Sequence, residues 1–435
     1  MRPLFKISKL GICTALLGAP LLSHAYTLID KDNHHLSFNG EADVGAFHSQ
    51  ETYGNPHKSP SWQEGFIKFG LSGDQKAANG TFFSTINAIS SGTWGDGDAS
   101  GATTGSERKT NIEDLFIGYR TKNIEFSTGR QGVVVGNGFI INNDALNLGK
   151  GLNGPTAGTG VHPNRGGAFW LAARKSFHNT AILRLGGDKG WRSDIYWLKS
   201  NNEAQASVEM AGINIENHNK YGVVGFLFNK GLSVDQKEAN FFGLNKRDGQ
   251  KTMSVRYQGD AGIKPLFLSA QYVKQTQGDN SKNAKAWYAE VGWTFDQIAW
   301  SPSLHYRFTR YGEGYDPLFY GFSSRGYGTW FQGEVAANYA GPSGSTIDSD
   351  IQSVQLSATP TDKVSVGALY FDFSKTQNDT GKNNAKEVDL WMQWAVNDHL
   401  IISPLVGFYK PKSNTSKQGN DNTNVYSQVI AIMPF

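Results

Sequence analysis

Apolar and polar side chains alternate along many segments of this chain. In residues 285–295, KAWYAEVGWTF, Trp287 and the other apolar members fall on one face of an extended strand, while Glu290 falls on the other. Segments 331–339 and 386–394 repeat this pattern. Each segment has about the length of a tilted transmembrane strand, roughly nine to eleven residues. The pattern therefore predicts strands with one apolar face and one wet face.

The number of such segments between Leu36 and Phe435 predicts an all-β fold, a transmembrane antiparallel β-barrel. We expect about 18 strands (roughly 16–20), because single-chain bacterial barrels have even strand counts. A soluble sandwich also alternates, since it has one buried and one wet face. Aromatic residues gather at the strand ends and no segment has a convincing amphipathic helical pattern, so we favour the barrel.

The connections predict long extracellular loops and short periplasmic turns. The alternation is least regular around 187–206 and 340–350, where the pattern does not fix the strand boundaries. The long polar loops are expected at 48–61, 94–110 and 132–166, and the short turns at Lys122-Asn123 and His178-Asn179.

The last residues of the sequence, SQVIAIMPF (427–435), also have a strand pattern. A closed barrel needs its last strand to pair with its first, because lipid tolerates no free sheet edge. Val429, Ala431, Met433 and Phe435 share one face of this segment. Apolar residues at alternate positions before a terminal Phe resemble the signature by which the outer-membrane insertion machinery recognises barrels.

Residues 1–25 have the pattern of a secretory signal peptide, with basic residues, a short apolar stretch and Ser23-His24-Ala25 as a small-residue cleavage site. We expect residues 26–435 to form one barrel domain in the outer membrane of a Gram-negative cell. Removing residues 1–25 lowers Lys plus Arg from 41 to 38, which equals Asp plus Glu, and also removes Cys13, the only cysteine. A neutral, exported chain without cysteine is not expected to bind nucleic acid or to form disulfides.

In such a barrel the charged side chains on the wet faces are the candidates for a solute path. Arginine binds carboxylate or phosphate at two points and stays charged, whereas most lysines here fall in loops. The same charges could instead pair across the lumen and only hold a polar interior together. The wet-phase arginines are Arg120, Arg174, Arg184, Arg256 and Arg307, and the wet-phase acids include Asp114, Glu290, Glu334, Glu387 and Asp389.

Two loops are candidates for a plug or gate. Residues 132–166 combine glycine-rich polar sequence with the apolar run Phe139-Ile140-Ile141, which would form a sticky patch if it were exposed. Residues 311–330 are rich in aromatic residues and glycine. The gating candidates in these two segments are Asn137, Phe139, Asp144, Tyr315 and Tyr320.

Three stretches, GRQGVVVGNGFII (129–141), AFWLAARKSFHNTAILR (168–184) and YDPLFYGFSSRGYGTWFQGE (315–334), resemble the alginate-export family of outer-membrane proteins. The resemblance implies an eighteen-stranded barrel with an arginine-lined, loop-gated conduit for an anionic polysaccharide. Carried over by position, it implies roles for Arg130, Asn137, Arg174, Asp316, Arg325 and Glu334. Asn137 stands where the family pattern has an acid. Arg130 shares the phase of apolar neighbours, so it needs a bulge near Gly129 to point inward.

The sequence therefore predicts a channel for anionic sugars or polysaccharide, with the lipid bilayer and an anionic carbohydrate or other small anionic solute as partners. The alternative is a general or small-solute-specific porin for other anionic nutrients. An outer-membrane lipid hydrolase is the less favoured prediction, because no spacing marks His305 or His399 as part of a Ser-His pair. We expect no enzyme activity and no cofactor. We also expect no metal, since His34-His35 lacks partners at metal-ligand spacing.

Overall fold

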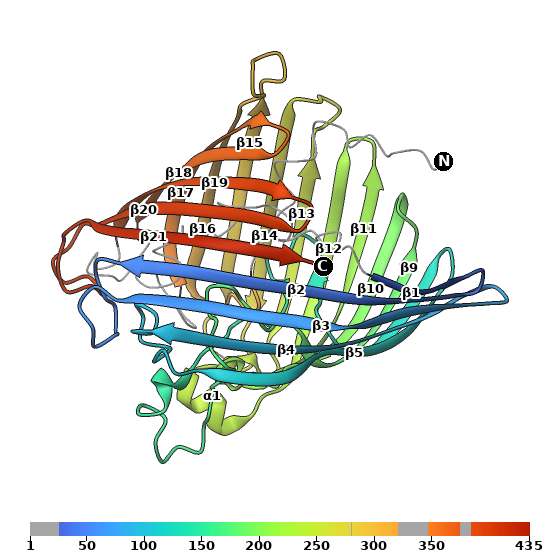
Figure 1. Cartoon of the computed structure of the whole chain (residues 1–435), viewed down its shortest axis with the longest axis horizontal. Helices are drawn as coiled ribbons and strands as arrows, with labels where there is room; N and C mark the ends of the chain where they lie inside the picture. Colours follow the sequence, from blue (N-terminus) through green and yellow to red (C-terminus); the bar gives the residue numbers. More distant parts are fainter. Residues whose placement is uncertain (1–25, 280, 321–346, 375–383) are drawn as a thin grey trace.

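A computed structural model describes residues 26–279, 281–320, 347–374 and 384–435. In this part of the chain, antiparallel strands form one closed barrel (Figure 1). Its 18 strands are β2 (His34–Ser49), β3 (Ser61–Ala77), β4 (Gly80–Gly95), β5 (Arg108–Arg120), β6 (Ile124–Gln131), β9 (Phe177–Gly186), β10 (Gly190–Lys199), β11 (Glu209–Asn219), β12 (Gly222–Ser233), β13 (Lys251–Gly259), β14 (Leu266–Thr276), β15 (Ala284–Thr294), β16 (Ser303–Tyr315), β17 (Ile347–Thr361), β18 (Val364–Ser374), β19 (Ala385–Asn397), β20 (Leu400–Pro411) and β21 (Asn424–Pro434).

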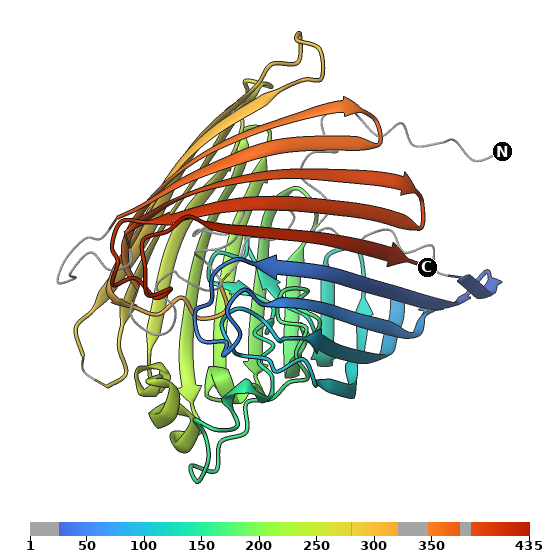
Figure 2. The ribbon, with the colours of Figure 1, turned by 60° about the vertical axis from the view of Figure 1, so that its left-hand side comes forward.

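The barrel closes between β2 and β21, which pair from Glu41↔Pro434 to Ser49↔Tyr426. Backbone hydrogen bonds join Gly40 N to Phe435 O at 2.6 Å and Phe435 N to Gly40 O at 2.9 Å. Below this point a short extra strand, β1 (Tyr26–Lys31), pairs with the free edge of β2. Figure 2 shows β1 extending past the C-terminus at this end of the barrel.

The strand faces follow the predicted alternation. In β15, Trp287, Val291 and Trp293 point outward, while Tyr288 and Glu290 are buried inside. Large apolar side chains are likewise exposed on the outer faces of most other strands, which is the surface that a bilayer covers. Within the described residues, no helix is long and apolar enough to cross a membrane.

Long loops gather at one end of the barrel, the loop end, and short turns at the other, the turn end. The turn end has connections at 78–79, 121–123, 187–189, 220–221, 260–265, 295–302, 362–363 and 398–399. The turn predicted at Lys122-Asn123 is therefore confirmed, and the turn predicted at His178-Asn179 is wrong. His178 and Asn179 lie inside β9, where the register with β6 shifts, and this polar, irregular stretch imitates a turn in the sequence.

The largest connection described is L3 (132–176), which continues ten residues beyond its predicted end at 166. It contains the two-stranded hairpin β7 (Val134–Val135) and β8 (Ile141–Asn142), and the 3₁₀ turn η2 (Lys150–Leu152). L4 (200–208) contains η3 (Glu203–Gln205). L5 (234–250) contains η4 (Asn245–Arg247) and α1 (Gln236–Phe242), a helix that the alternation did not predict. Figures 1 and 2 show α1 beside the projecting part of L3 at the loop end.

Candidate functional site

L3 begins where β6 stops short in the barrel wall. β6 pairs with β5 only as far as Leu115↔Arg130, so residues 108–114 of β5 have no partner in β6. Gly129 has a φ of +125°, and a Cβ at this position would lie 2.3 Å from Leu115 O. Only glycine fits there, because it alone adopts this φ without a side-chain clash. After Gln131 the chain leaves the wall and enters the lumen as L3.

The hairpin of β7 and β8, here called the L3 tip, packs against one side of the lumen. Residues 139–141 are fully buried. The ring of Phe139 lies 5.0 Å from that of Tyr288 on β15 and 6.2 Å from that of Tyr311 on β16. Asn137 Nδ2 donates to Tyr288 Oη at 2.6 Å. The apolar run therefore folds inward, as the sequence analysis expects, and packs on inward-facing tyrosines.

The other end of L3 packs against the far wall. The indole of Trp170 stacks on Tyr426 of β21 at 5.3 Å and on Phe47 of β2 at 6.1 Å. The buried carboxylate of Glu64 on β3 accepts hydrogen bonds from Trp170 N at 2.8 Å and Leu171 N at 3.1 Å. L3 is thus attached to β2, β3 and β21 on one side and to β15 and β16 on the other. It crosses the lumen.

The L3 tip also covers one of the predicted arginines. A Cβ on Gly136 would lie 2.5 Å from Cζ of Arg256, so the loop backbone rests directly on this guanidinium. Arg256 projects inward from β13, donates to Asn214 Oδ1 at 2.7 Å and forms an ion pair with Glu216. Arg256 is therefore shielded from solute by L3.

The loop that follows β16 is called L7. Its residues 316–320 dock on the L3 hairpin. Ile141 and Phe319 form a parallel bridge, in which Asn142 N donates to Phe319 O at 2.6 Å and Phe319 N donates to Ile140 O at 3.1 Å. The two loops therefore form one inserted body. Arg325 and Glu334, which the resemblance implies for the solute path, lie outside the described residues.

A buried ion pair holds L7 to L5. Arg247 Nε and Nη2 donate to the carboxylate of Asp316 at 2.8 and 2.9 Å. Burial raises the pKa of Asp316, but the charge and hydrogen bonds of Arg247, together with the charge of Lys246 and the backbone N–H of Leu318, hold that pKa below its ordinary value. Burial also raises the pKa of Tyr320 to about 12, so its phenol stays neutral. Tyr315 is buried beside Tyr311, with ring centroids 5.6 Å apart.

The arginines that project inward from strands are paired with acids. Arg184, Arg256 and Arg307 come from β9, β13 and β16. Each has a carboxylate neighbour, as expected if ion pairs hold the interior together. The pairs are Arg184 with Glu125 at 2.5 Å, Arg256 with Glu216, and Arg307 with Glu290 at 3.7 Å.

Three other predicted arginines are not part of this set, although Arg120 shares the inward phase, since it stands opposite the inward-facing Thr81. Arg120 stands at the turn end and pairs with Asp74 at 3.0 Å. Arg174 is not on a strand, as the phase predicted, but in L3, where its Nε lies 3.3 Å from Glu113 Oε2. The alternation predicts a strand that contains Arg174 and ends at the turn His178-Asn179, whereas the structure places this segment in L3, before β9.

Arg130 does not line the lumen, contrary to the prediction. The bulge required near Gly129 is present, since the β6 register with β9 shifts between Gly129 and Gln131. Arg130 nevertheless stands opposite the outward-facing Leu115, and its Nη2 contacts Nδ1 of the exposed His178 at 2.6 Å. The shift turns Gln131 inward and leaves Arg130 on the outer phase.

The predicted acids Asp114 and Asp389 lie on the inner side of β5 and β19. Asp114 accepts from Asn87 Nδ2 and from Ser176 Oγ, both at 2.8 Å, and so fixes the last residue of L3 to β5. Asp389 is fully buried on β19. Within the described ranges, no three His, Cys, Asp or Glu side chains come together at a possible metal site.

A partly open charged patch on β9 and β10 contains Arg192 and Asp194, which the alternation did not mark as candidates. Arg192 and Arg184 both approach Asp194 Oδ1, at 3.3 and 3.6 Å. The two arginine side chains are 36% and 35% exposed, whereas Asp194 is 11% exposed. Alternation in WRSDIYW (191–197) could have placed Arg192 on the wet face, but this segment lies in the region left unassigned.

On the other wall, Lys68 pairs with Glu41 at 3.1 Å.

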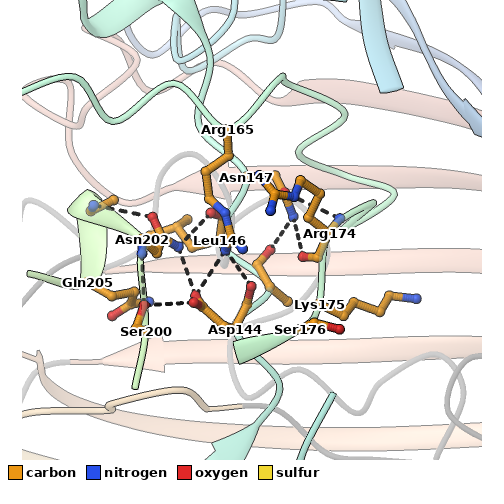
Figure 3. A network of polar contacts seen from close by, with 12 residues as sticks. Asp144, Leu146, Asn147, Arg165, Arg174, Lys175, Ser176, Ser200, Asn202 and Gln205 are labelled. Atoms are coloured by element: carbon orange, nitrogen blue, oxygen red, sulfur yellow. Dashed lines mark hydrogen bonds and ion pairs between the residues drawn. The ribbon is translucent and has the colours of Figure 1, made fainter. Parts of the chain in front are cut away.

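Asp144 ties L3 to L4 (Figure 3). Its buried carboxylate accepts from Arg165 Nη1 at 3.0 Å, from Ser200 Oγ at 2.7 Å and from Asn202 Nδ2 at 2.9 Å. Asn202 Nδ2 also donates to Leu146 O at 2.9 Å. Asp144 is thus a fixed point of the loop body and is not exposed to a passing solute.

Comparison with known proteins places the architecture. No family model and no curated protein sequence matches the chain. Solved structures do match, among them Acinetobacter baumannii OccAB3, with a TM-score of 0.60, 9% identity and coverage of 92% of this chain and 99% of that chain. Pseudomonas aeruginosa OccK2 (OpdF) matches with a TM-score of 0.59, 10% identity and coverage of 92% and 97%.

Pseudomonas aeruginosa OccK5 (OpdH) gives a TM-score of 0.57, 10% identity and coverage of 92% and 98%. These neighbours belong to the Occ and OprD group of outer-membrane porins. At such identities the likeness establishes only the fold, an 18-stranded barrel. The matches cover nearly the whole length of both chains. The likeness supports an outer-membrane β-barrel and does not support the specific resemblance to alginate exporters.

Proposed function

We propose that this chain is an outer-membrane porin that admits small solutes, with a preference for those that carry negative charge. The observation that carries this proposal is the path of L3, which is attached to both walls and crosses the lumen. A loop held in this way narrows the passage by fixed contacts. That arrangement favours the small-solute alternative over the export of a polysaccharide.

The fold supports residence in the outer membrane. The outer faces of the strands carry exposed apolar side chains, and the inner faces carry ion pairs and amides. A closed barrel is one of the two structures that satisfy every backbone group in lipid. The likeness in fold to solved porins points in the same direction.

The preference for anions rests on the patch of Arg184, Arg192 and Asp194. Because the two guanidinium groups are more accessible than the carboxylate between them, a solute passing this part of the wall meets more positive than negative charge. Glu125 offsets part of this charge, since it pairs with Arg184. We therefore expect a moderate selectivity for anions.

The test is the reversal potential of the purified protein in a planar bilayer under a KCl gradient. Replacing both arginines by glutamine (Arg184→Gln with Arg192→Gln) should shift the reversal potential toward cation selectivity. Arg310→Gln is the matched control, because Arg310 is likewise partly exposed and paired with an acid, Asp350, but stands on the outward phase of β16. An unchanged reversal potential in the double variant would refute the role of this patch.

Liposome swelling separates small-solute entry from polysaccharide transport. A uronate monomer should enter vesicles that contain the protein faster than a neutral sugar of similar size, and a long uronate polymer should neither enter nor block. Strong block of the channel by the polymer would instead support a polysaccharide conduit.

A further inference from the structure

A basic cavity opens through the barrel wall above the short strand β6. Because residues 108–114 of β5 lack a partner in β6, the wall has a notch between β5 and β9 at the loop end. Residues 162–165 of L3 border the notch, together with Asn201 and Glu203 of L4. The cavity has a volume of about 390 Å³.

The charges that line this notch are mostly positive. Lys109, Arg130, Arg165 and Arg174 supply four cations, and Glu203 is the one carboxylate among the lining residues. Glu203 is already engaged, since its carboxylate accepts a hydrogen bond from the backbone N–H of His162. Burial, followed by the neighbouring charge of Arg165, lowers the pKa of Arg174.

Arg165 carries donors that no described residue satisfies. Its side chain is 5% exposed, and Nη1 donates to the backbone oxygen and Oδ1 of Asp144, at 2.6 and 3.0 Å (Figure 3). Nε and Nη2 are buried and have no hydrogen-bond partner among the described residues. Arg130 Nη1 is in the same state. Leaving buried guanidinium N–H groups unpaired is costly, so an acceptor that entered the notch would bind favourably.

The lining of the notch includes both phases of the wall, since Lys109 stands opposite the inward-facing Ser91, and other lining residues stand on the outer side. Ile112, one of the lining residues, is 44% exposed and stands opposite Ala88 on the outward phase of β4. His178 is exposed on β9, and Arg130 stands opposite the outward-facing Leu115. The site therefore faces the height at which lipid headgroups surround the loop end, and it lies apart from the lumenal patch of Arg184 and Arg192.

We propose that this notch binds a phosphate group, carried by the headgroup of an anionic glycolipid in the surrounding leaflet. A phosphate offers several acceptor oxygens to the unpaired N–H groups and two negative charges to the cluster of cations. The cavity is larger than a lone phosphate needs, which leaves room for part of the attached sugar. Free phosphate shares this chemistry and is the other possible source. The inference rests on the outer-membrane residence in the proposed function, but not on the transport of solutes.

The experiment is native mass spectrometry of the detergent-solubilised full chain, with diphosphorylated lipid A, the same lipid dephosphorylated, and inorganic phosphate as separate probes. Lipid A should be retained and dephosphorylated lipid should not. In the double variant Lys109→Gln with Arg130→Gln, lipid A affinity should fall at least about tenfold. These two cations form no ion pair with a carboxylate among the described residues, so replacing them leaves the Arg165–Asp144 and Arg174–Glu113 pairs intact.

Arg120→Gln, at the turn end, is the control and should retain the lipid like the wild type. Arg130→Lys keeps the charge but loses the planar fork, so it should restore part of the affinity that Arg130→Gln loses. Heat-modifiable mobility in electrophoresis confirms that each variant is a folded barrel. Equal retention of phosphorylated and dephosphorylated lipid, or no loss in the folded double variant, would overturn the proposal. Binding of inorganic phosphate without lipid A would overturn the lipid as the source.

Discussion

At the scale of single residues, burial decides what an arginine contributes. Arg247 with Asp316 and Arg310 with Asp350 are both two-point pairs of similar length. The first is almost completely buried, whereas the Arg310 side chain is 47% exposed. Removing one member of a buried pair leaves an uncompensated charge, while water replaces the partner at an exposed site.

We therefore predict that Arg247→Leu costs about 3–5 kcal/mol of local stability in L5 and L7. Arg310→Leu, the matched control, should cost about 0–1 kcal/mol. Amide hydrogen exchange of residues 236–248 and 316–319 measures the first effect. The double variant Arg247→Leu with Asp316→Leu should recover much of the loss, because neither member of the pair is left as an uncompensated buried charge. Equal costs for the two single variants would contradict this explanation.

The phase of the strands could be predicted residue by residue, but the partners of each side chain could not. Alternation correctly turned Arg184, Arg256 and Arg307 inward. It could not show which acids neutralise them, because the paired strands are distant in the sequence. It also placed Arg174 on a strand and left Arg130 dependent on a bulge. A single extra residue reverses every following side chain, so a bulge of uncertain position leaves such residues unassigned.

At the scale of elements, L5 is the part of the fold that the alternation does not describe. Asp235 caps α1 by accepting from Lys237 N and Glu238 N, at 3.0 and 3.1 Å, and Gly243 ends it with a φ of +68°. Burial, followed by the negative charges of Asp235 and Glu203, raises the pKa of Glu238 to about 7. A seven-residue helix is not stable alone, so its order depends on its contacts with the surrounding loops.

This shift predicts that α1 loosens as the pH rises. An acid whose pKa is raised in the folded state stabilises that state when protonated. The contribution is therefore complete below about pH 4.5 and is lost as the pH rises through about 7. Hydrogen exchange of the α1 amides, corrected for intrinsic rates, should show protection that falls between pH 5 and pH 8. Glu238→Gln should abolish this dependence, and a pH profile unchanged by that substitution would refute the assignment.

Most strands could be predicted from period alone, whereas the early end of β6 could not. The segment GRQGVVVGN continues the apolar character of a strand past Gln131. What removes it from the wall is the geometry at Gly129 and the packing of 139–141 on Tyr288, a contact between positions far apart in sequence. The sequence also did not predict that L3 extends to residue 176, because AFWLAAR (168–174) has the composition of a strand.

At the scale of the whole molecule, closure and loop insertion have separate causes. The ring closes because β21 pairs with β2, and this followed from the requirement that lipid leaves no sheet edge. The inserted body follows from contacts that L3 makes with both walls and with L7 and L4. The alginate-export resemblance implied an eighteen-stranded barrel and also an anionic polysaccharide as its solute, and the comparisons support the barrel but not that family, because a fold does not determine a substrate.

The crossing of the lumen by L3 is the central claim, and single-channel conductance tests it most directly. Residues 136–142 are replaced by a short Gly-Ser linker, which keeps L3 continuous and removes Asn137, Phe139 and the docking strand β8. We predict that conductance increases about twofold or more, because the tip no longer occupies the passage between β2 and β15. A folded variant with the conductance of the wild type would show that the L3 tip does not narrow the path, and would contradict the account.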